Sequence, residues 1–152
     1  MDILIGGAQY IDSCLAIARV LPQYFSELAF PIMSRDFREY RLYVAVDSNE
    51  VVGFISIQSK NSQVVEILWM AVKPGYQRQG VGTLLMNQIV ADLKAEGVRL
   101  LEVKTLAATV DYAPYVPTRQ FYENKGFVHL ETIDPYPEWQ PGNACAIYVK
   151  VL

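Results

Sequence analysis

The alternation of apolar and polar positions divides the chain into helical and extended segments. Over residues 10–25, apolar side chains recur every three or four positions, which predicts a helix with one buried face. The β-rich runs 42–46 and 51–57 flank a polar turn, so we expect an antiparallel hairpin there, and a short strand at 3–5 precedes the helix. Residues 64–72 are apolar on both faces except for one acid, which predicts a central strand.

Predicted helices and strands also alternate in the second half of the chain. A helix of about four turns is predicted from residue 81 to a left-handed cap at Gly97. A strand at 99–104, a loop at 105–117, a helix at 118–125 and two strands at 127–132 and 144–151 follow. Because no repeat or linker interrupts these elements, we expect one domain over residues 1–152.

Composition and charge narrow the classes of function. The chain has 152 residues, is 52% hydrophobic and carries a formal charge of -3, which argues against general nucleic-acid binding but allows a local basic cluster. No apolar stretch approaches the roughly 20 residues that span a bilayer. Cys14 and Cys145 lie far apart without metal-ligand spacing, so we expect reduced thiols, no metal site and a cytoplasmic protein.

One stretch has the character of a phosphate-binding loop. Gln77-Arg78-Gln79-Gly80-Val81-Gly82-Thr83 lies between the buried strand and an amphipathic helix. Glycines let the backbone turn sharply, and the first amides of a helix have no intrahelical acceptor and carry the positive end of its dipole. Such an end binds phosphate; Arg78 adds charge, and Thr83 offers a hydroxyl or caps the helix. The alternative is a glycine-rich connection without a ligand.

These residues resemble the signature of the GNAT superfamily of acyl-coenzyme A-dependent N-acyltransferases. The signature is glutamine or arginine, two residues, glycine, one residue, then glycine or alanine, and Gln77, Gly80 and Gly82 match it. Residues 68–74 look like the family's fourth strand, and residues 119–127 look like its late helix and the strand after it. The three segments stand in the family's order, which makes chance coincidence a poor explanation.

The resemblance implies both a fold and a chemistry. The fold is α/β (α+β), with a mixed, mostly antiparallel central sheet that is flanked by helices and splayed between its fourth and fifth strands. Acetyl-coenzyme A (acetyl-CoA) is the implied acyl donor, with its pyrophosphate on residues 77–83 and its pantetheine arm along the backbone of Met70, Ala71 and Val72. The implied acceptor is a primary amine of a small molecule or peptide, which attacks directly in a ternary complex without a metal.

Tyr122 is the candidate general acid. It matches the family tyrosine proposed to lie near the coenzyme A sulfur, and a phenol can donate a hydrogen bond to a departing thiolate. The alternative is a helix tyrosine that packs against the sheet, because its ring is largely apolar.

Glu66 is the candidate base. It is the only charge in residues 64–72, and the resemblance implies a carboxylate there that acts on the amine, often through water. An isolated carboxylate in an apolar strand should have a raised affinity for protons. Strand alternation places it on the face of Leu68 and Met70 unless a bulge intervenes. The alternative is a solvated or paired structural acid.

Aromatic side chains mark the expected acceptor side. Trp69 borders the fourth strand, and the late loops contribute Tyr112, Tyr115, Tyr136 and Trp139. Their rings suit a small amine or a peptide end and can attract an ammonium ion, or they cover a core or a dimer interface. Asp111 is a weaker candidate base, and we expect a structural role for His129.

Two other predictions concern function class and assembly. A non-catalytic acyl-coenzyme A binding or sensing domain would keep residues 77–82 but lose the proton-handling groups, so Tyr122 and Glu66 argue against it. Many relatives pair through late strands, and the apolar run 144–151 offers such a surface for a homodimer.

Overall fold

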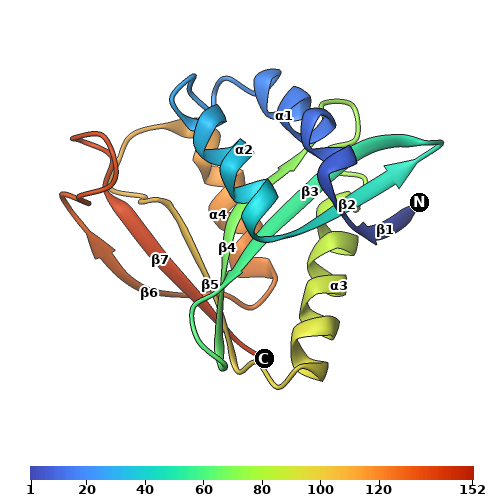
Figure 1. The fold of residues 1–152 in the computed structure, drawn as a ribbon. Helices are drawn as coiled ribbons and strands as arrows, with labels where there is room; N and C mark the ends of the chain where they lie inside the picture. The colour runs from blue at the N-terminus through green and yellow to red at the C-terminus, as the bar shows by residue number, and fades with distance from the viewer.

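The computed structural model covers residues 1–152 and is built around a seven-stranded sheet in the order β1-β2-β3-β4-β5-β7-β6 (Figure 1). The strands are β1 Asp2–Ile5, β2 Arg41–Asp47, β3 Glu50–Ser59, β4 Val64–Val72, β5 Leu100–Leu106, β6 Val128–Ile133 and β7 Cys145–Val151. All neighbours are antiparallel except β4 and β5, which are parallel. The mixed, mostly antiparallel sheet is therefore confirmed.

Four helices cover the two faces of the sheet. They are α1 Ile11–Arg19, α2 Ala29–Glu39, α3 Val81–Ala95 and α4 Val116–Asn124, with short 3₁₀ turns at Ala8–Tyr10 and Ala113–Tyr115. One core cluster joins α1 and α2 to the sheet through buried side chains such as Met33, Phe37 and Phe54. A second, on the opposite face, joins α3 and α4 to it through Leu85, Ile89 and Tyr122. These two cores hold the sheet between two helical layers.

The helical pattern near the N-terminus differs from the prediction. The first helix ends at Arg19, because Leu21 precedes Pro22 and a residue before proline is disfavoured in helical conformation. A helix that the sequence analysis did not predict, α2, follows at Ala29–Glu39. Its Pro31 lies in the first turn, where the missing N–H group is not needed, so proline does not prevent the helix.

The order of the late strands changes which strand is available for the expected dimer contact. β7 lies between β5 and β6, so the run 144–151 already has both backbone edges paired within its own sheet. β6 is the outer strand, and it leaves Val128 and Leu130 largely exposed. A homodimer formed through late strands would therefore involve β6 first, and dimerisation itself stays a prediction.

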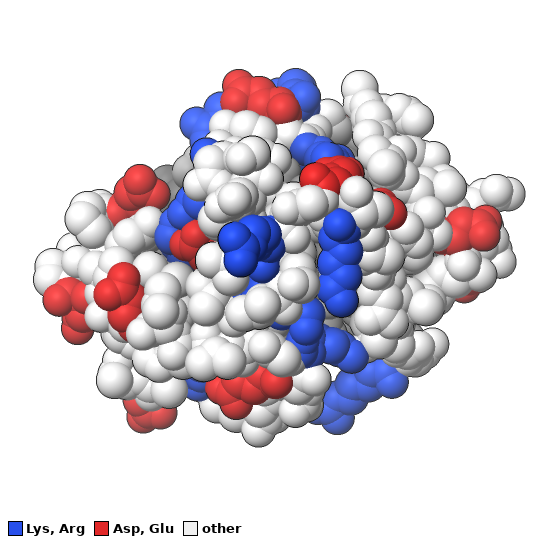
Figure 2. Space-filling view, turned by 90° about the horizontal axis from the view of Figure 1, so that it is seen from below, with Lys and Arg blue, Asp and Glu red and all other residues white.

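Charge is unevenly distributed over the surface. Viewed from the base of the sheet, where the C-terminus lies, lysine and arginine gather in a band across the molecule, which is the kind of local basic cluster that the sequence allowed (Figure 2). The start of α3 lies at the opposite end, toward the top of Figure 1. None of the helices has both the length and the apolar character needed to cross a bilayer.

Candidate functional site

The sheet opens between its two parallel strands. β4 and β5 pair only over residues 64–67 and 100–103, although β4 continues to Val72 and β5 to Leu106. On its other side β4 stays paired with β3 as far as Val72. Residues 68–72 therefore present one backbone edge that no strand covers, and β4 and β5 diverge toward the top of Figure 1. The predicted splay between the fourth and fifth strands is confirmed.

The start of α3 lies beside this opening and offers unpartnered backbone donors. The N–H groups of residues 77–83 have no hydrogen-bond acceptor in the protein, and Leu84 N, bonded to Gly80 O at 3.0 Å, is the first that does. The loop reaches this arrangement through positive φ angles at Gly75 (93°), Arg78 (62°) and Gly80 (84°). Such a run of free amides at a helix start is a site for an anion.

The polar side chains of the loop before α3 have different roles. Gln77 Nε2 donates to Val72 O at 3.1 Å, and Gln79 Nε2 donates to Gly75 O at 2.6 Å, so both amides brace the turn. Arg78 is exposed and forms no ion pair. Its guanidinium is therefore free to meet a phosphate, whereas the two glutamines act on the loop itself.

Gly80 and Gly82 are required for different reasons. Gly80 caps α3 in the left-handed conformation, and a Cβ there would have nothing within 4 Å. At Gly82 a Cβ would lie 3.1 Å from Met70 Cε and 3.3 Å from Phe121 Cε1. The first turn of α3 thus packs closely on both β4 and α4, so Gly82 is needed for packing whether or not a ligand binds.

Tyr122 lies at the opening, on the face of α3 and α4. Its side chain is buried, and its hydroxyl lies 3.9 Å from the Sδ atom of Met70, on the uncovered stretch of β4. Burial, with a smaller effect of the Tyr115 phenol, raises the pKa of Tyr122 far above its ordinary value of 10.0. The phenol therefore keeps its proton in the neutral range and is available as a donor.

A bulge decides which face Glu66 occupies. The register between β3 and β4 shifts at Leu68, which is one extra residue in β4. Glu66 therefore lies on the face of Trp69 and Ala71, toward α1 and α2, whereas Met70 faces α3 and α4. The face that simple alternation predicts for Glu66 is wrong for this reason.

Glu66 is buried, as expected, but it is not isolated. Lys104 Nζ lies 3.1 Å and Lys60 Nζ 3.6 Å from its carboxylate oxygens, and Lys60 also contacts Glu102 at 2.7 Å. Burial lowers the pKa of the Lys104 ammonium, but the charge of Glu66 and a hydrogen bond to it raise that pKa above its usual value overall. The four side chains form a neutralised cluster at the base of the opening.

Tyrosine hydroxyls tie the segment between α1 and α2 to the loop before α4. Tyr24 donates to Pro114 O at 2.9 Å, Tyr115 to Tyr24 O at 3.2 Å and Tyr112 to Gln23 O at 2.7 Å. Tyr112 is exposed and Tyr115 is half-buried. The two predicted acceptor-side tyrosines are thus brought together, and their hydroxyls are used to hold two segments in place.

Trp69 lies on the face of β4 toward α1 and α2 and is fixed by a contact that the sequence did not reveal. Its Nε1 donates to Asp36 Oδ2 on α2 at 2.7 Å, and its ring lies 6.2 Å from that of Phe25. Trp139 lies in the turn between β6 and β7, where its ring packs at 5.3 Å against Tyr136. Lys104 Nζ is 5.8 Å from the Tyr136 ring, which places this turn beside the charged cluster.

A family model for the acetyltransferase (GNAT) domain matches residues 38–129, which include the opening, the loop and α4. The chain belongs to the GNAT family of acetyltransferases. A Desulfovibrio desulfuricans protein assigned to this family has a similar structure, with a TM-score of 0.83, 21% identity and coverage of 99% of this chain and 98% of that one.

Two further solved structures show the same fold. One is a GNAT acetyltransferase from Elizabethkingia anophelis with acetyl-CoA bound, at a TM-score of 0.75, 19% identity and coverage of 99% and 97%. The other is the aminoglycoside 6′-N-acetyltransferase of Enterococcus faecium, at a TM-score of 0.74, 18% identity and coverage of 99% and 97%. No curated protein sequence matches the chain.

Besides Glu102 of the charged cluster, two buried charges of this GNAT fold were not assigned a role from sequence. Arg119, one turn before Tyr122, donates from Nη1 to Leu106 O at 2.8 Å and so fixes α4 against the end of β5. Asp36 holds Trp69. The spacing of Arg119 and Tyr122, which places both on one face of a helix, was a readable signal, whereas nothing local marked Asp36.

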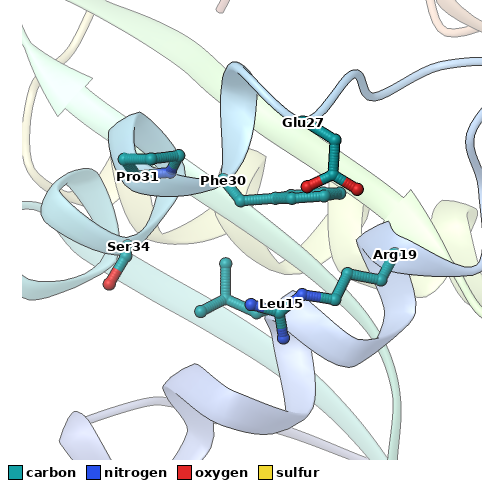
Figure 3. A pocket seen from close by; sticks show the side chains of 6 residues that line it. All are labelled: Leu15, Arg19, Glu27, Phe30, Pro31 and Ser34. Carbon is teal, nitrogen blue, oxygen red and sulfur yellow. The ribbon is translucent and has the colours of Figure 1, made fainter.

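Asp111 and His129 take no part in this GNAT opening. Asp111 lies on an exposed loop, and exposed His129 shares a hydrogen bond of 2.9 Å with Thr132 Oγ1 on the outer strand β6. A separate pocket of about 320 Å³ lies between α1 and α2 and is lined by Leu15, Arg19, Glu27, Phe30, Pro31 and Ser34 (Figure 3). None of the predicted site residues lines it.

Proposed function

We propose that the chain is an N-acetyltransferase that moves the acetyl group of acetyl-CoA to a primary amine by direct attack in a ternary complex. One observation carries the proposal: the unpartnered amides of residues 77–83 lie beside an uncovered backbone edge of β4 at residues 68–72. A pyrophosphate and an amide-bearing arm on one ligand would satisfy both sets of groups.

The residues at this opening fit the donor. The amides of residues 77–83 and the free guanidinium of Arg78 suit the pyrophosphate, and the Thr83 hydroxyl adds a further donor. The backbone of Met70 to Val72 suits the pantetheine arm. When bound, acetyl-CoA supplies an acyl group on a good leaving group, and the strand amides there stabilise negative charge on the carbonyl oxygen.

Tyr122 is proposed to protonate the departing sulfur. As the amine nitrogen forms its bond to the carbonyl carbon, the carbon–sulfur bond breaks and the thiolate takes the phenolic proton. The support is geometric, because the Tyr122 hydroxyl lies against Met70 on the uncovered stretch of β4. Burial raises the pKa of Tyr122, so the phenol is protonated at neutral pH.

Glu66 is proposed to receive the proton of the amine through water. It lies on the acceptor face of β4, just below the point where β4 and β5 separate. Its ion pairs with Lys104 and Lys60 support a structural role equally well. The acceptor itself is proposed to lie among Trp69, Tyr112, Tyr115 and Trp139.

Calorimetric titration with acetyl-CoA tests this function. We expect the unaltered protein to bind and Arg78→Glu to bind at least about tenfold more weakly, because a like charge then faces the pyrophosphate. Arg99→Glu is the matched control, since Arg99 is exposed and lies at the other end of α3. Absence of binding by the unaltered protein would overturn the proposal.

A panel of amines, with thiol release as the readout, then tests the transfer step. Aminoglycosides, polyamines, amino acids and peptides sample the chemistry of primary amines. Release that depends on an added amine supports the enzyme. Binding of acetyl-CoA without release for any of these classes would favour an acyl-coenzyme A binding or sensing domain.

A further inference from the structure

A buried carboxylate on α2 has no part in the chemistry described above. Asp36 is only 5% exposed, and its Oδ2 accepts a hydrogen bond of 2.7 Å from Trp69 Nε1. Its Oδ1 accepts one of 3.1 Å from Arg35, whose side chain is 60% exposed. A buried charge is costly unless it is paired, and here the exposed Arg35 and the indole N–H of Trp69 share that pairing.

Trp69 lies on the proposed acceptor side of the opening. It lies in residues 68–72, the part of β4 that β5 leaves uncovered, on the face of α1 and α2. The indole is held at its nitrogen by Asp36 and flanked by Phe25, whose ring is tilted by 59° to it. Part of the residue stays exposed, so a fixed aromatic surface borders the opening.

The aromatic rings of the protein differ in whether a lysine or arginine side chain lies over the ring face. Lys104 lies over Tyr136, Lys125 over Phe121 and Arg19 over Phe30. No lysine or arginine of the chain lies over Trp69. Trp69 therefore offers the most electron-rich type of aromatic face, next to the opening, with no cation of the protein on it.

From this arrangement we propose that Asp36 is a positioning residue that acts through Trp69, so that the indole face receives the ammonium ion of the acceptor. The carboxylate fixes the ring through a charge-assisted hydrogen bond and pushes electron density into it, which strengthens attraction for a cation. The inference rests on the proposed function and adds the acceptor class: a primary alkylammonium that is bound in its protonated form.

Intrinsic fluorescence tests the inference without acetyl-CoA. The chain has two tryptophans, so Trp139→Phe, which keeps an aromatic ring at that proposed acceptor-side position, leaves Trp69 as the only one. This parent variant is titrated near neutral pH, at constant ionic strength, with n-butylammonium chloride and with 1-butanol, a neutral analogue of similar length. We expect the ammonium to bind about three- to thirty-fold more tightly than the alcohol, the range that cation–π attraction provides.

Two substitutions in this parent separate charge from structure. Asp36→Asn keeps an oxygen that accepts the indole N–H but removes the charge, so we expect the emission maximum to stay and the ammonium preference to fall. Glu39→Gln removes an equal charge from an exposed site on the same helix and should leave the preference unchanged.

If Asp36→Asn does not fold, Trp69→Phe provides the same comparison in the natural sequence. It keeps a ring but loses the N–H link to Asp36, and protection of the protein from thermal unfolding by butylammonium replaces fluorescence as the readout. Equal affinity of the parent for ammonium and alcohol, or an unchanged preference in Asp36→Asn, would overturn the inference. Neither result depends on whether acetyl-CoA binds.

Discussion

Single residues at the opening differ in their proposed distance from the reacting atoms, and Tyr122 is the proposed proton donor. We expect Tyr122→Phe to lower kcat roughly a hundredfold, the scale of general acid catalysis, and to change KM for acetyl-CoA little. Steady-state thiol release measures both constants. Tyr148→Phe serves as the control, because the Tyr148 hydroxyl donates to Glu123 and not to the uncovered stretch of β4. An unchanged kcat would leave Tyr122 as a packing residue.

The sequence predicts residues whose role depends on the backbone or on local spacing. Gly80 occupies a left-handed cap and Tyr122 follows from the late-helix motif, so both were recognisable. Asp36 was not, because its partner Trp69 lies 33 positions away and is brought near only by packing of α2 on the sheet. A contact between distant residues leaves no periodic signal in one sequence.

At the level of elements, substitutions in the charged cluster that joins β4 and β5 test whether Glu66 is a catalytic base or a structural acid. We expect Glu66→Gln to lower kcat roughly a hundredfold if Glu66 accepts the amine proton, and Lys104→Met to lower it far less. Both changes break a partly buried ion pair and should reduce stability, which thermal unfolding measures.

Glu102→Gln is the control for the loss of a carboxylate from the same cluster. This change removes the β5 carboxylate that pairs with Lys60 and leaves the Glu66 carboxylate on β4 intact. If Glu66→Gln and Lys104→Met lower kcat equally, Glu66 acts only by pairing with the ammonium groups, and another group takes the proton.

Elements with a strong pattern were predicted, and those with a mixed pattern were not. The bounds of β4 match the prediction, and the predicted start of α3 at residue 81 and its left-handed cap at Gly97 are observed. Helix α2 was missed because Pro31 and the polar positions around it interrupt the apolar stripe that its buried face needs. The bulge at Leu68 was weighed but not predictable, since an extra residue in a strand is defined by its partner strand.

The whole molecule places the proposed donor-side and acceptor-side groups on opposite sides of one opening. The free amides of α3 and the Tyr122 phenol lie on the side of α3 and α4, and Trp69 and Glu66 lie on the side of α1 and α2. The uncovered stretch of β4 contributes Met70 to the first side and Trp69 to the second. We propose that one ligand on each side meets the other at residues 68–72, as direct transfer in a ternary complex requires.

Folding also buries ionisable groups that make the stability of the protein depend on pH in the alkaline range. Burial raises the pKa of the Cys14 thiol from 9.0 to about 12 and that of Tyr115 from 10.0 to about 12. Because the folded state holds these protons more tightly, the resulting stabilisation is complete below the unfolded pKa values. It is lost as pH rises from about 9 for Cys14 toward about 12.

Cys14→Val isolates the thiol, because it removes the ionisable group at nearly constant volume from a fully buried site on α1. We expect the parent to lose about 1.4 kcal/mol more than the variant between about pH 8 and pH 10, one pH unit above the ordinary thiol value. Urea unfolding under reducing conditions at the two pH values gives this difference. If the two proteins lose the same free energy, the unfolded state retains the environment of Cys14, and burial in the native core is not what protects the thiol.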